Sequence, residues 1–244
     1  MSAASLLAVK RIHAGYQSGI DILQDLSLSA EAHKLTLIIG PNGAGKSTLL
    51  RTIFGFLHPY DGSIAFNGER IDALQPYAVK RQGISYVPQE INIFPHLTVE
   101  ENLRMGAWTL RQDKARLRRQ FERTYETFPA LAARRRLRAG DLSGGQGRLL
   151  SVAREMMTEP TLMLVDEPTA GLAPNLVDEV YGLLDRARQA IGATVVLVDQ
   201  NVEDALPHAD YIYMINLGRI KAEGPPRDFT APRIRELIQE CLLG

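Results

Sequence analysis

The sequence has few of the features that would assign the chain to several common protein classes. It has one cysteine, Cys241, in 244 residues, which excludes an internal disulfide and a cysteine zinc cluster. Lys and Arg together number 28, and so do Asp and Glu, which leaves a formal net charge of zero. A neutral chain argues against nucleic-acid binding by bulk charge, so we expect no nucleic-acid partner.

Long apolar runs are also missing. No window approaches the roughly 18 consecutive apolar residues that a membrane-spanning helix needs. The first ten residues lack a basic start followed by a long apolar core, so we expect no secretory signal. We therefore expect a cytoplasmic chain, and any work at a membrane would need a partner that spans it.

The sequence does contain short apolar runs, at 35–39, 162–165 and 194–198. Each is rich in Val, Ile or Leu and ends at Gly or Asp. Such runs predict strands that are buried on both faces, as in a parallel sheet. Helical stretches between them predict an α/β fold with a mainly parallel sheet.

A second set of strands is expected near the start of the chain. Candidates at 7–12, 22–28 and 63–66 are separated by Gly, Asp and Asn, which predicts a small antiparallel β flank. Asp61-Gly62 is a hairpin signal, and Asn67-Gly68 is expected to close the next turn.

A helical insertion interrupts this predicted core. Thr98-Val-Glu-Glu101 has the pattern of a capping box that opens a helix. A run dense in charged residues follows, with apolar residues at helical spacing. We predict a single domain, in which a helical subdomain at 91–150 is inserted into a core formed by 1–90 and 151–244.

The strongest motif follows the first apolar run. It has the Gly-x4-Gly-Lys-Ser/Thr pattern of a phosphate-binding loop (P-loop) and precedes a predicted helix at 49–56. Glycines let successive backbone N–H groups turn inward around phosphates. Lys46 can reach the β- and γ-phosphates, and the Ser47 hydroxyl can bind Mg²⁺. The residues expected to bind nucleotide are Gly40, Pro41, Asn42, Gly43, Ala44, Gly45, Lys46, Ser47 and Thr48.

Two carboxylates end the second apolar run, at Asp166 and Glu167. Ligands of open α/β sheets bind at the carboxyl ends of the strands. Asp166 can therefore hold Mg²⁺, through water, while Glu167 can polarise the attacking water as a general base.

A third motif, Leu142-Ser-Gly-Gly-Gln146, lies 20 residues before the Asp-Glu strand and ahead of a predicted helix at 147–157. Together with the P-loop it resembles the ATP-binding-cassette (ABC) ATPases, over essentially the whole chain from about residue 6. The resemblance implies that the chain binds ATP with Mg²⁺ and forms a head-to-tail homo- or heterodimer. In that dimer, Ser143, Gly144, Gly145 and Gln146 of one subunit contact the nucleotide on the P-loop of the other.

The resemblance implies roles for further positions. Tyr16, 24 residues before Gly40, matches the aromatic residue that stacks on adenine. Gln89, in Tyr86-Val-Pro-Gln89, matches the glutamine that touches Mg²⁺ and the attacking water. Residues 170–173 match a loop that crosses the dimer interface.

One position departs from the family pattern. Most members place a histidine that senses the γ-phosphate after the strand at 194–198, and here Gln200 occupies that position. A glutamine amide can donate a hydrogen bond to a phosphate oxygen but carries no charge. The Gln200-Asn201 pair and Leu172-Ala-Pro174 resemble the importers of branched-chain amino acids, amides and urea.

We therefore expect the ATP-hydrolysing subunit of an importer for a small polar or hydrophobic solute, such as branched-chain amino acids or related amides. Its expected partners are transmembrane permease subunits, a second ATPase subunit and, indirectly, a periplasmic or extracellular solute-binding protein. It would sit peripherally on the cytoplasmic face of the inner or plasma membrane. A groove containing Phe94, Leu97 and Val99 would accept a short permease helix, although the same residues suit a core.

Two alternatives remain open at this point. One is a soluble ABC ATPase that is not coupled to transport. The other is a nucleotide-gated assembly switch that binds ATP without turnover, against which the intact Glu167 argues.

Overall fold

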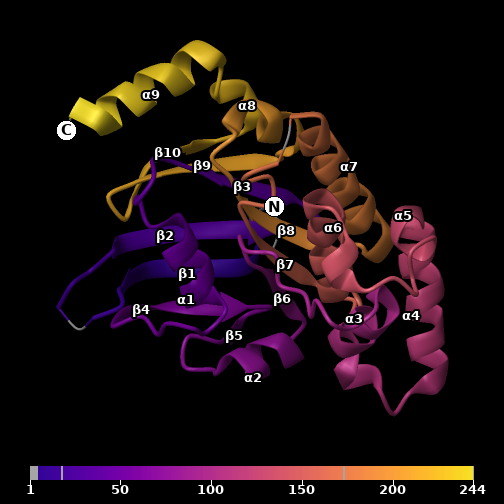
Figure 1. The fold of residues 1–244 in the computed structure, drawn as a ribbon. Helices are drawn as coiled ribbons and strands as arrows, with labels where there is room; N and C mark the ends of the chain where they lie inside the picture. Colours follow the sequence, from indigo (N-terminus) through magenta and orange to yellow (C-terminus); the bar gives the residue numbers. More distant parts are fainter. Residues whose placement is uncertain (1–4, 18, 173, 244) are drawn as a thin grey trace.

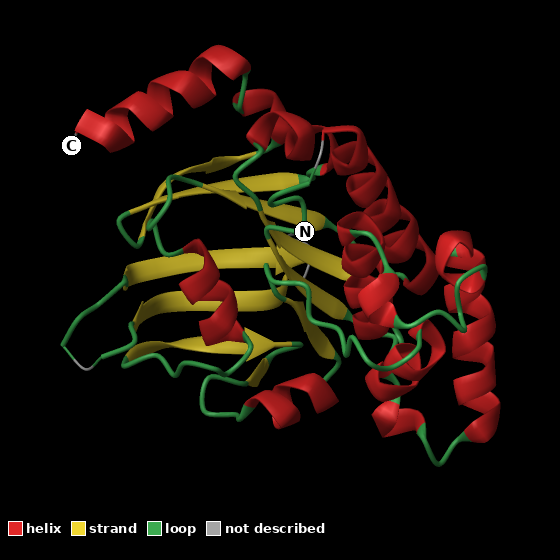
Figure 2. Cartoon of the chain, viewed as in Figure 1, coloured by secondary structure: helices red, strands yellow, loops and turns green. Residues whose placement is uncertain are grey.

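A computed structural model describes residues 5–17, 19–172 and 174–243, which form two sheets with helices packed around them (Figures 1 and 2). The larger sheet has the strand order β10-β9-β3-β8-β7-β6 and is parallel except for the antiparallel pair β9–β10. Its strands are β3 (Leu35–Ile39), β6 (Ile84–Val87), β7 (Leu162–Asp166), β8 (Thr194–Val198), β9 (Tyr211–Asn216) and β10 (Arg219–Gly224). The three apolar runs are strands as expected, and the α/β fold is confirmed. β6, β9 and β10 were not predicted.

The smaller sheet is the expected antiparallel flank, in the order β2-β1-β4-β5. It consists of β1 (Ser5–Ala14), β2 (Leu23–Glu31), β4 (Asp61–Phe66) and β5 (Glu69–Arg70). Asn67 and Gly68 both have positive φ and join β4 to β5, as the hairpin rule requires.

The expected hairpin turn at Asp61-Gly62 was wrong, because both residues lie inside β4. Gly62 has φ +89° and faces an irregularity in the pairing of β4 with β1, between Lys10 and His13. A Cβ on Gly62 would lie 2.5 Å from the carbonyl oxygens of Lys10 and Arg11. Two residues of β1 lie opposite this one residue of β4, so the glycine accommodates a bulge in β1 and does not form a turn.

The two helices that carry motif residues lie earlier in the chain than the sequence predicts, and several short helices were not predicted. They are α1 (Lys46–Ile53), α2 (Pro76–Arg81), α3 (Val99–Gly106), α4 (Lys114–Thr127), α5 (Pro129–Ala132), α6 (Gly144–Met156), α7 (Pro174–Ile191), α8 (Val202–Ala205) and α9 (Ala231–Leu243). Short 3₁₀ turns occur at η1 (Trp108–Leu110), η2 (Ala139–Asp141), η3 (Leu206–His208) and η4 (Pro226–Asp228). Helix α1 spans Lys46–Ile53 instead of 49–56, and α6 spans Gly144–Met156 instead of 147–157. The last three P-loop residues and residues 144–146 thus form the first turns of helices.

Two apolar layers cover the larger sheet, and each buried strand contributes to both by alternation. Leu35, Leu37 and Ile39 of β3 face the layer formed with α6 and α7. Ile38 faces the opposite layer, which α1 and the antiparallel sheet complete. This sandwiching keeps the parallel strands out of water on both faces, as their unbroken apolar sequence requires.

Helices α3, α4 and α5 lie on one side of the molecule, beside α6 (Figure 1). Helices α3 and α6 approach so closely that a Cβ on Gly106 would lie 2.3 Å from the carbonyl oxygen of Arg154. Among the described helices, none combines the length and apolarity that crossing a membrane requires.

The capping box at the start of α3 is confirmed. The Glu101 amide donates to Thr98 Oγ1 at 3.2 Å, and the Thr98 amide donates to the Glu101 carboxylate at 2.8 Å. These two bonds satisfy backbone donors that the first turn of a helix otherwise leaves unpaired.

We expect Thr98→Ala to lower the free energy of unfolding by about 1 kcal/mol, because it removes the N-cap acceptor. Chemical denaturation of the full chain measures this. Thr109→Ala, at an exposed threonine of η1, is the matched control and should change stability little. Equal stability of the two variants would show that the cap contributes nothing.

Candidate functional site

The polar residues of the site come from four neighbouring strand ends. β3, β6, β7 and β8 are parallel, so their carboxyl ends meet at one edge of the sheet. A cavity of about 330 Å³ opens there. It is lined by Ile22, Asn42, Gly43, Gly45, Lys46, Ser47, Thr48, Gln89, Glu167 and Gln200. The structure thus brings six of the nine predicted P-loop residues and the three predicted catalytic residues to one cavity, whereas Gly40, Pro41 and Ala44 do not line it.

The loop after β3 can only be built with glycine at its critical positions. Gly40 has φ +152°, and a Cβ there would lie 2.1 Å from the carbonyl oxygen of Ile215. Gly45 has φ +103° and is the N-cap of α1 without a side-chain cap. The first N–H groups of α1 are therefore left for an external acceptor, and the positive end of the helix dipole favours an anion.

Lys46 lies folded over this loop. Its Nζ donates to the carbonyl oxygens of Gly40 at 2.8 Å and Pro41 at 3.0 Å. Burial lowers the pKa of Lys46, against the opposing effect of the charges on Glu167 and Asp166. An ammonium that is only partly compensated is well suited to binding a phosphate group.

Two of the three predicted metal ligands, Ser47 and Asp166, are in contact, and the third, Gln89, lines the same cavity as Ser47. Ser47 Oγ donates to Asp166 Oδ1 at 3.0 Å, and the Tyr86 hydroxyl donates to Asp166 Oδ2 at 3.1 Å. Burial raises the pKa of Asp166, and these two hydrogen bonds oppose the rise. Tyr86 was quoted in the sequence motif without a role, and the structure gives it one as the support of Asp166.

These residues fit Mg²⁺. Within the described parts of the chain, no group of three or more His, Cys, Asp or Glu side chains could hold a metal ion by itself. Magnesium is usually bound by one or two protein oxygens, together with water and substrate phosphates. The Ser47 hydroxyl and Asp166 carboxylate are oxygen donors of that kind, and a phosphate on the adjacent loop would complete the set.

The Glu167 carboxylate is held between two amides. Gln89 Nε2 donates to Oε2 at 2.8 Å, and Gln200 Nε2 lies 2.7 Å from both carboxylate oxygens. Glu167 has φ +43°, and its amide donates to the Val198 carbonyl at 2.8 Å. The backbone after β7 therefore holds the predicted base in place, together with the glutamines that follow the neighbouring strands β6 and β8.

Asp199 is a buried carboxylate that the sequence reading left without a role. Its Oδ2 accepts from Thr169 Oγ1 at 2.9 Å, and its Oδ1 accepts from the Asn201 amide at 2.9 Å. Burial raises the pKa of Asp199, and these hydrogen bonds oppose the rise. Asp199 thus connects the segment after Glu167 with the segment that carries Gln200. Thr169 and Asp199 are 30 residues apart in the chain, so their contact cannot be predicted from a single sequence.

Tyr16 and the Ser143 segment lie outside the cavity. Tyr16 is exposed, and its hydroxyl accepts a hydrogen bond from Arg51 of α1 at 2.9 Å. Ser143 caps α6, with Gln146 completing a capping box, and none of residues 143–146 lines the cavity. Residues 170–172 line a neighbouring cavity of about 460 Å³, while Ala173 lies outside the described residues.

Comparison with known proteins assigns the family. The family described as ABC transporter matches residues 23–170, which hold the P-loop, the Ser143 motif and the Asp166–Glu167 pair. The chain belongs to the ABC transporter family. This ABC protein accordingly is an ATPase, of the type that couples hydrolysis to transport.

Relatives and solved structures resemble the ABC ATPase along its length. BraG of Pseudomonas aeruginosa, a high-affinity branched-chain amino acid transport ATP-binding protein, is 39% identical over 91% of this chain and 94% of its own. LivF of Archaeoglobus fulgidus, a probable branched-chain amino acid transport ATP-binding protein, is 36% identical over 90% and 92%. The ADP conformation of the ATP-binding cassette MJ1267 matches with a TM-score of 0.85 and 28% identity over 99% of each chain.

We expect Glu167→Gln to lower ATP hydrolysis by about 10²-fold or more, because the amide cannot accept a proton from water. Nucleotide binding should persist. Because bound ATP is then not hydrolysed, we expect the variant to accumulate as an ATP-bound dimer, which size-exclusion chromatography would detect. Phosphate release measures the turnover. Glu203→Gln, at an exposed carboxylate of α8, is the matched control. Unchanged hydrolysis by Glu167→Gln would exclude Glu167 as the base.

Gln200→Ala removes the amide that contacts both oxygens of Glu167. A hydrogen bond to a charged group contributes about 1.5–3 kcal/mol, so turnover should fall by about tenfold or more. Steady-state phosphate release measures the effect, with Gln189→Ala on the exposed surface of α7 as the control. A rate equal to that of the unaltered protein would show that Gln200 does not contribute to hydrolysis.

Proposed function

We propose that the chain is the ATP-hydrolysing subunit of an importer for branched-chain amino acids or chemically related amides. Similarity to LivF and BraG over about nine-tenths of both chains supports this substrate class. The Gln200-Asn201 pair that follows β8 supports the same subgroup.

We propose that hydrolysis takes place in a head-to-tail dimer. The separation of the two motifs within one chain supports this: Lys46 and Glu167 line the cavity, whereas Ser143 does not. ATP bound with Mg²⁺ would lie between the P-loop of one subunit and Ser143–Gln146 of the other, with adenine on Tyr16. A two-fold axis makes both sites equivalent in a homodimer.

The roles of the residues follow from their contacts. Lys46 and the first turn of α1 would bind the β- and γ-phosphates, while Ser47, Asp166 and Gln89 would hold the metal. When bound by these residues, Mg²⁺ would supply positive charge that stabilises the γ-phosphate during its transfer to water. Glu167, oriented by Gln89 and Gln200, would accept the proton of the attacking water.

An exposed apolar surface is the candidate docking face for a permease. We define the docking face as Ile91, Phe94 and Met105, each of which is more than 40% exposed. Phe94 is fixed in place because its amide donates to Asn102 Oδ1 at 2.8 Å. Val99, which the sequence suggested for this groove, is fully buried and belongs to the core instead.

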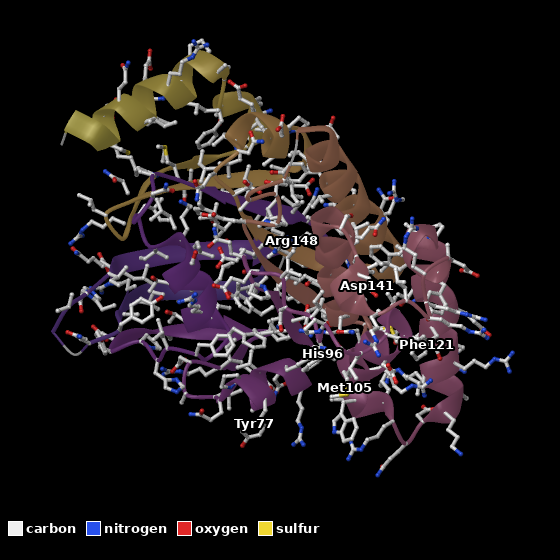
Figure 3. All side chains as sticks on the ribbon, in the orientation of Figure 1. Tyr77, His96, Met105, Phe121, Asp141 and Arg148 are labelled. Carbon is white, nitrogen blue, oxygen red and sulfur yellow. The ribbon has the colours of Figure 1, made fainter. Side chains whose placement is uncertain are left out.

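We propose that residues 91–150 act as a helical subdomain and that permease subunits hold the chain peripherally at the cytoplasmic membrane face. Figure 3 shows the exposed side chain of Met105 on α3, within this subdomain. A solute-binding protein would take part only through the permease. The alternative is a soluble ABC ATPase, for which the docking face would have no partner.

The test is capture of the chain with its permease from native membranes. We expect the unaltered chain to co-purify with permease subunits, and Phe94→Glu to lose them because a buried carboxylate in an apolar interface is costly. Leu217→Glu, which changes another exposed apolar residue in the turn between β9 and β10, should retain them. Absence of any membrane protein from the unaltered preparation would favour the soluble alternative.

A further inference from the structure

The connection between α3 and α4 concentrates positive charge at one end of the molecule. Residues 104–119 contain six basic residues and one acidic residue, although the chain as a whole is neutral. The one carboxylate, Asp113, caps α4 by accepting from the Arg116 amide at 2.9 Å. Figure 1 shows this connection as the lowest point of the molecule in that view. The charge therefore lies on a projecting surface.

Half of these basic residues have no counter-charge. Ion pairs with glutamates occupy the other half, which are Arg104, Arg116 and Arg118. Arg111, Lys114 and Arg119 are exposed, and none of them forms an ion pair with a carboxylate in the described parts of the chain. Their charges remain available to an external anionic surface.

An exposed aromatic side chain lies among these charges. Trp108, the one tryptophan of the sequence, is 58% exposed. The Arg111 guanidinium lies 4.9 Å from its ring centroid, and Arg111 Nη1 donates to the Trp108 carbonyl at 3.1 Å. The ring and the charge are thus held side by side. Tryptophan next to Lys and Arg is typical of protein surfaces that rest on lipid headgroups.

The position of these residues decides between two anionic partners, an acidic protein loop and a lipid surface. Trp108 follows Met105 of the docking face by three residues, so the two surfaces are adjacent. Cytoplasmic loops of membrane proteins carry an excess of Lys and Arg, which would repel Arg111 and Lys114. The cytoplasmic leaflet itself is anionic and would attract them. Charge complementarity therefore favours lipid.

We propose that a cationic tip, defined as Trp108, Arg111 and Lys114, contacts an anionic lipid surface directly. The two basic side chains bind headgroup phosphates, and the Trp108 ring lies at the depth of the headgroups. This contact goes beyond the proposed attachment through a permease. It is tested with lipid alone, so its failure would leave the permease docking and the ATPase untouched.

The test is binding of the full chain, without a permease, to vesicles of equal parts phosphatidylglycerol and phosphatidylcholine. Trp108 is the only tryptophan, so its fluorescence reports on the tip itself. We expect a blue shift, and quenching by brominated lipid, with these vesicles but not with phosphatidylcholine alone. Raising the salt concentration from 0.1 M to 1 M shortens the Debye length from about 10 Å to about 3 Å, so binding should fall.

Charge reversal locates the contact. Each basic residue near an anionic surface contributes roughly fivefold in affinity, so Arg111→Glu with Lys114→Glu should weaken vesicle binding by about 25-fold or more. Arg227→Glu with Arg235→Glu changes the net charge equally at exposed residues of η4 and α9, and should bind like the unaltered chain. None of the four residues lines the nucleotide cavity, so preserved ATP hydrolysis shows that both variants fold.

Several results would overturn the proposal. These are an unchanged Trp108 spectrum in the unaltered chain, equal binding to both kinds of vesicle, or equal losses in the two charge-reversed variants. Binding to a polyglutamate peptide but not to vesicles would assign the cationic tip to an acidic protein instead. If the variant at Arg111 and Lys114 does not fold, the salt dependence and the lipid quenching of Trp108 in the unaltered chain decide the question.

Discussion

Pairing of β8 with both β3 and β7 is the constraint on which the rest of the site depends. Leu37 pairs with Leu197, and Asp166 pairs with Val198, so three strand ends are held in one register. The P-loop, Glu167 and Gln200 each follow one of these strands directly. A shift of one residue in β8 would move Gln200 away from Glu167. It would also point each side chain of β8 to the opposite face of the sheet. Burial of both faces therefore determines the catalytic geometry.

The sequence predicted what depends on local pattern. The three most apolar strands, the turn at Asn67-Gly68 and the capping box at Thr98 were all correct, because each is specified by residues close together in the chain. The P-loop and the Asp166–Glu167 pair were placed at one edge by the rule for parallel sheets. Their exact chemical roles remain predictions that follow from the family resemblance.

Contacts between distant segments could not be predicted in the same way. Nothing in the sequence indicates that Tyr86 supports Asp166 or that Asp199 bonds Thr169, since each pair depends on the packing of separate strands. Strand β10, with alternating exposure, lacks the apolar run that identified the central strands. The Asp61-Gly62 error has a similar origin, because a glycine with positive φ serves a bulge as well as a turn.

The close crossing of α3 and α6 at Gly106 has a mechanical consequence. The backbone carbonyl and the Cγ of Arg154 occupy the space that a side chain at position 106 would need, so the two helices pack closely here. Interiors packed this closely have low compressibility and transmit strain. A displacement of α3 at Met105 would therefore move α6, including its Ser143 end, by a similar amount. The two helices would move as one rigid body.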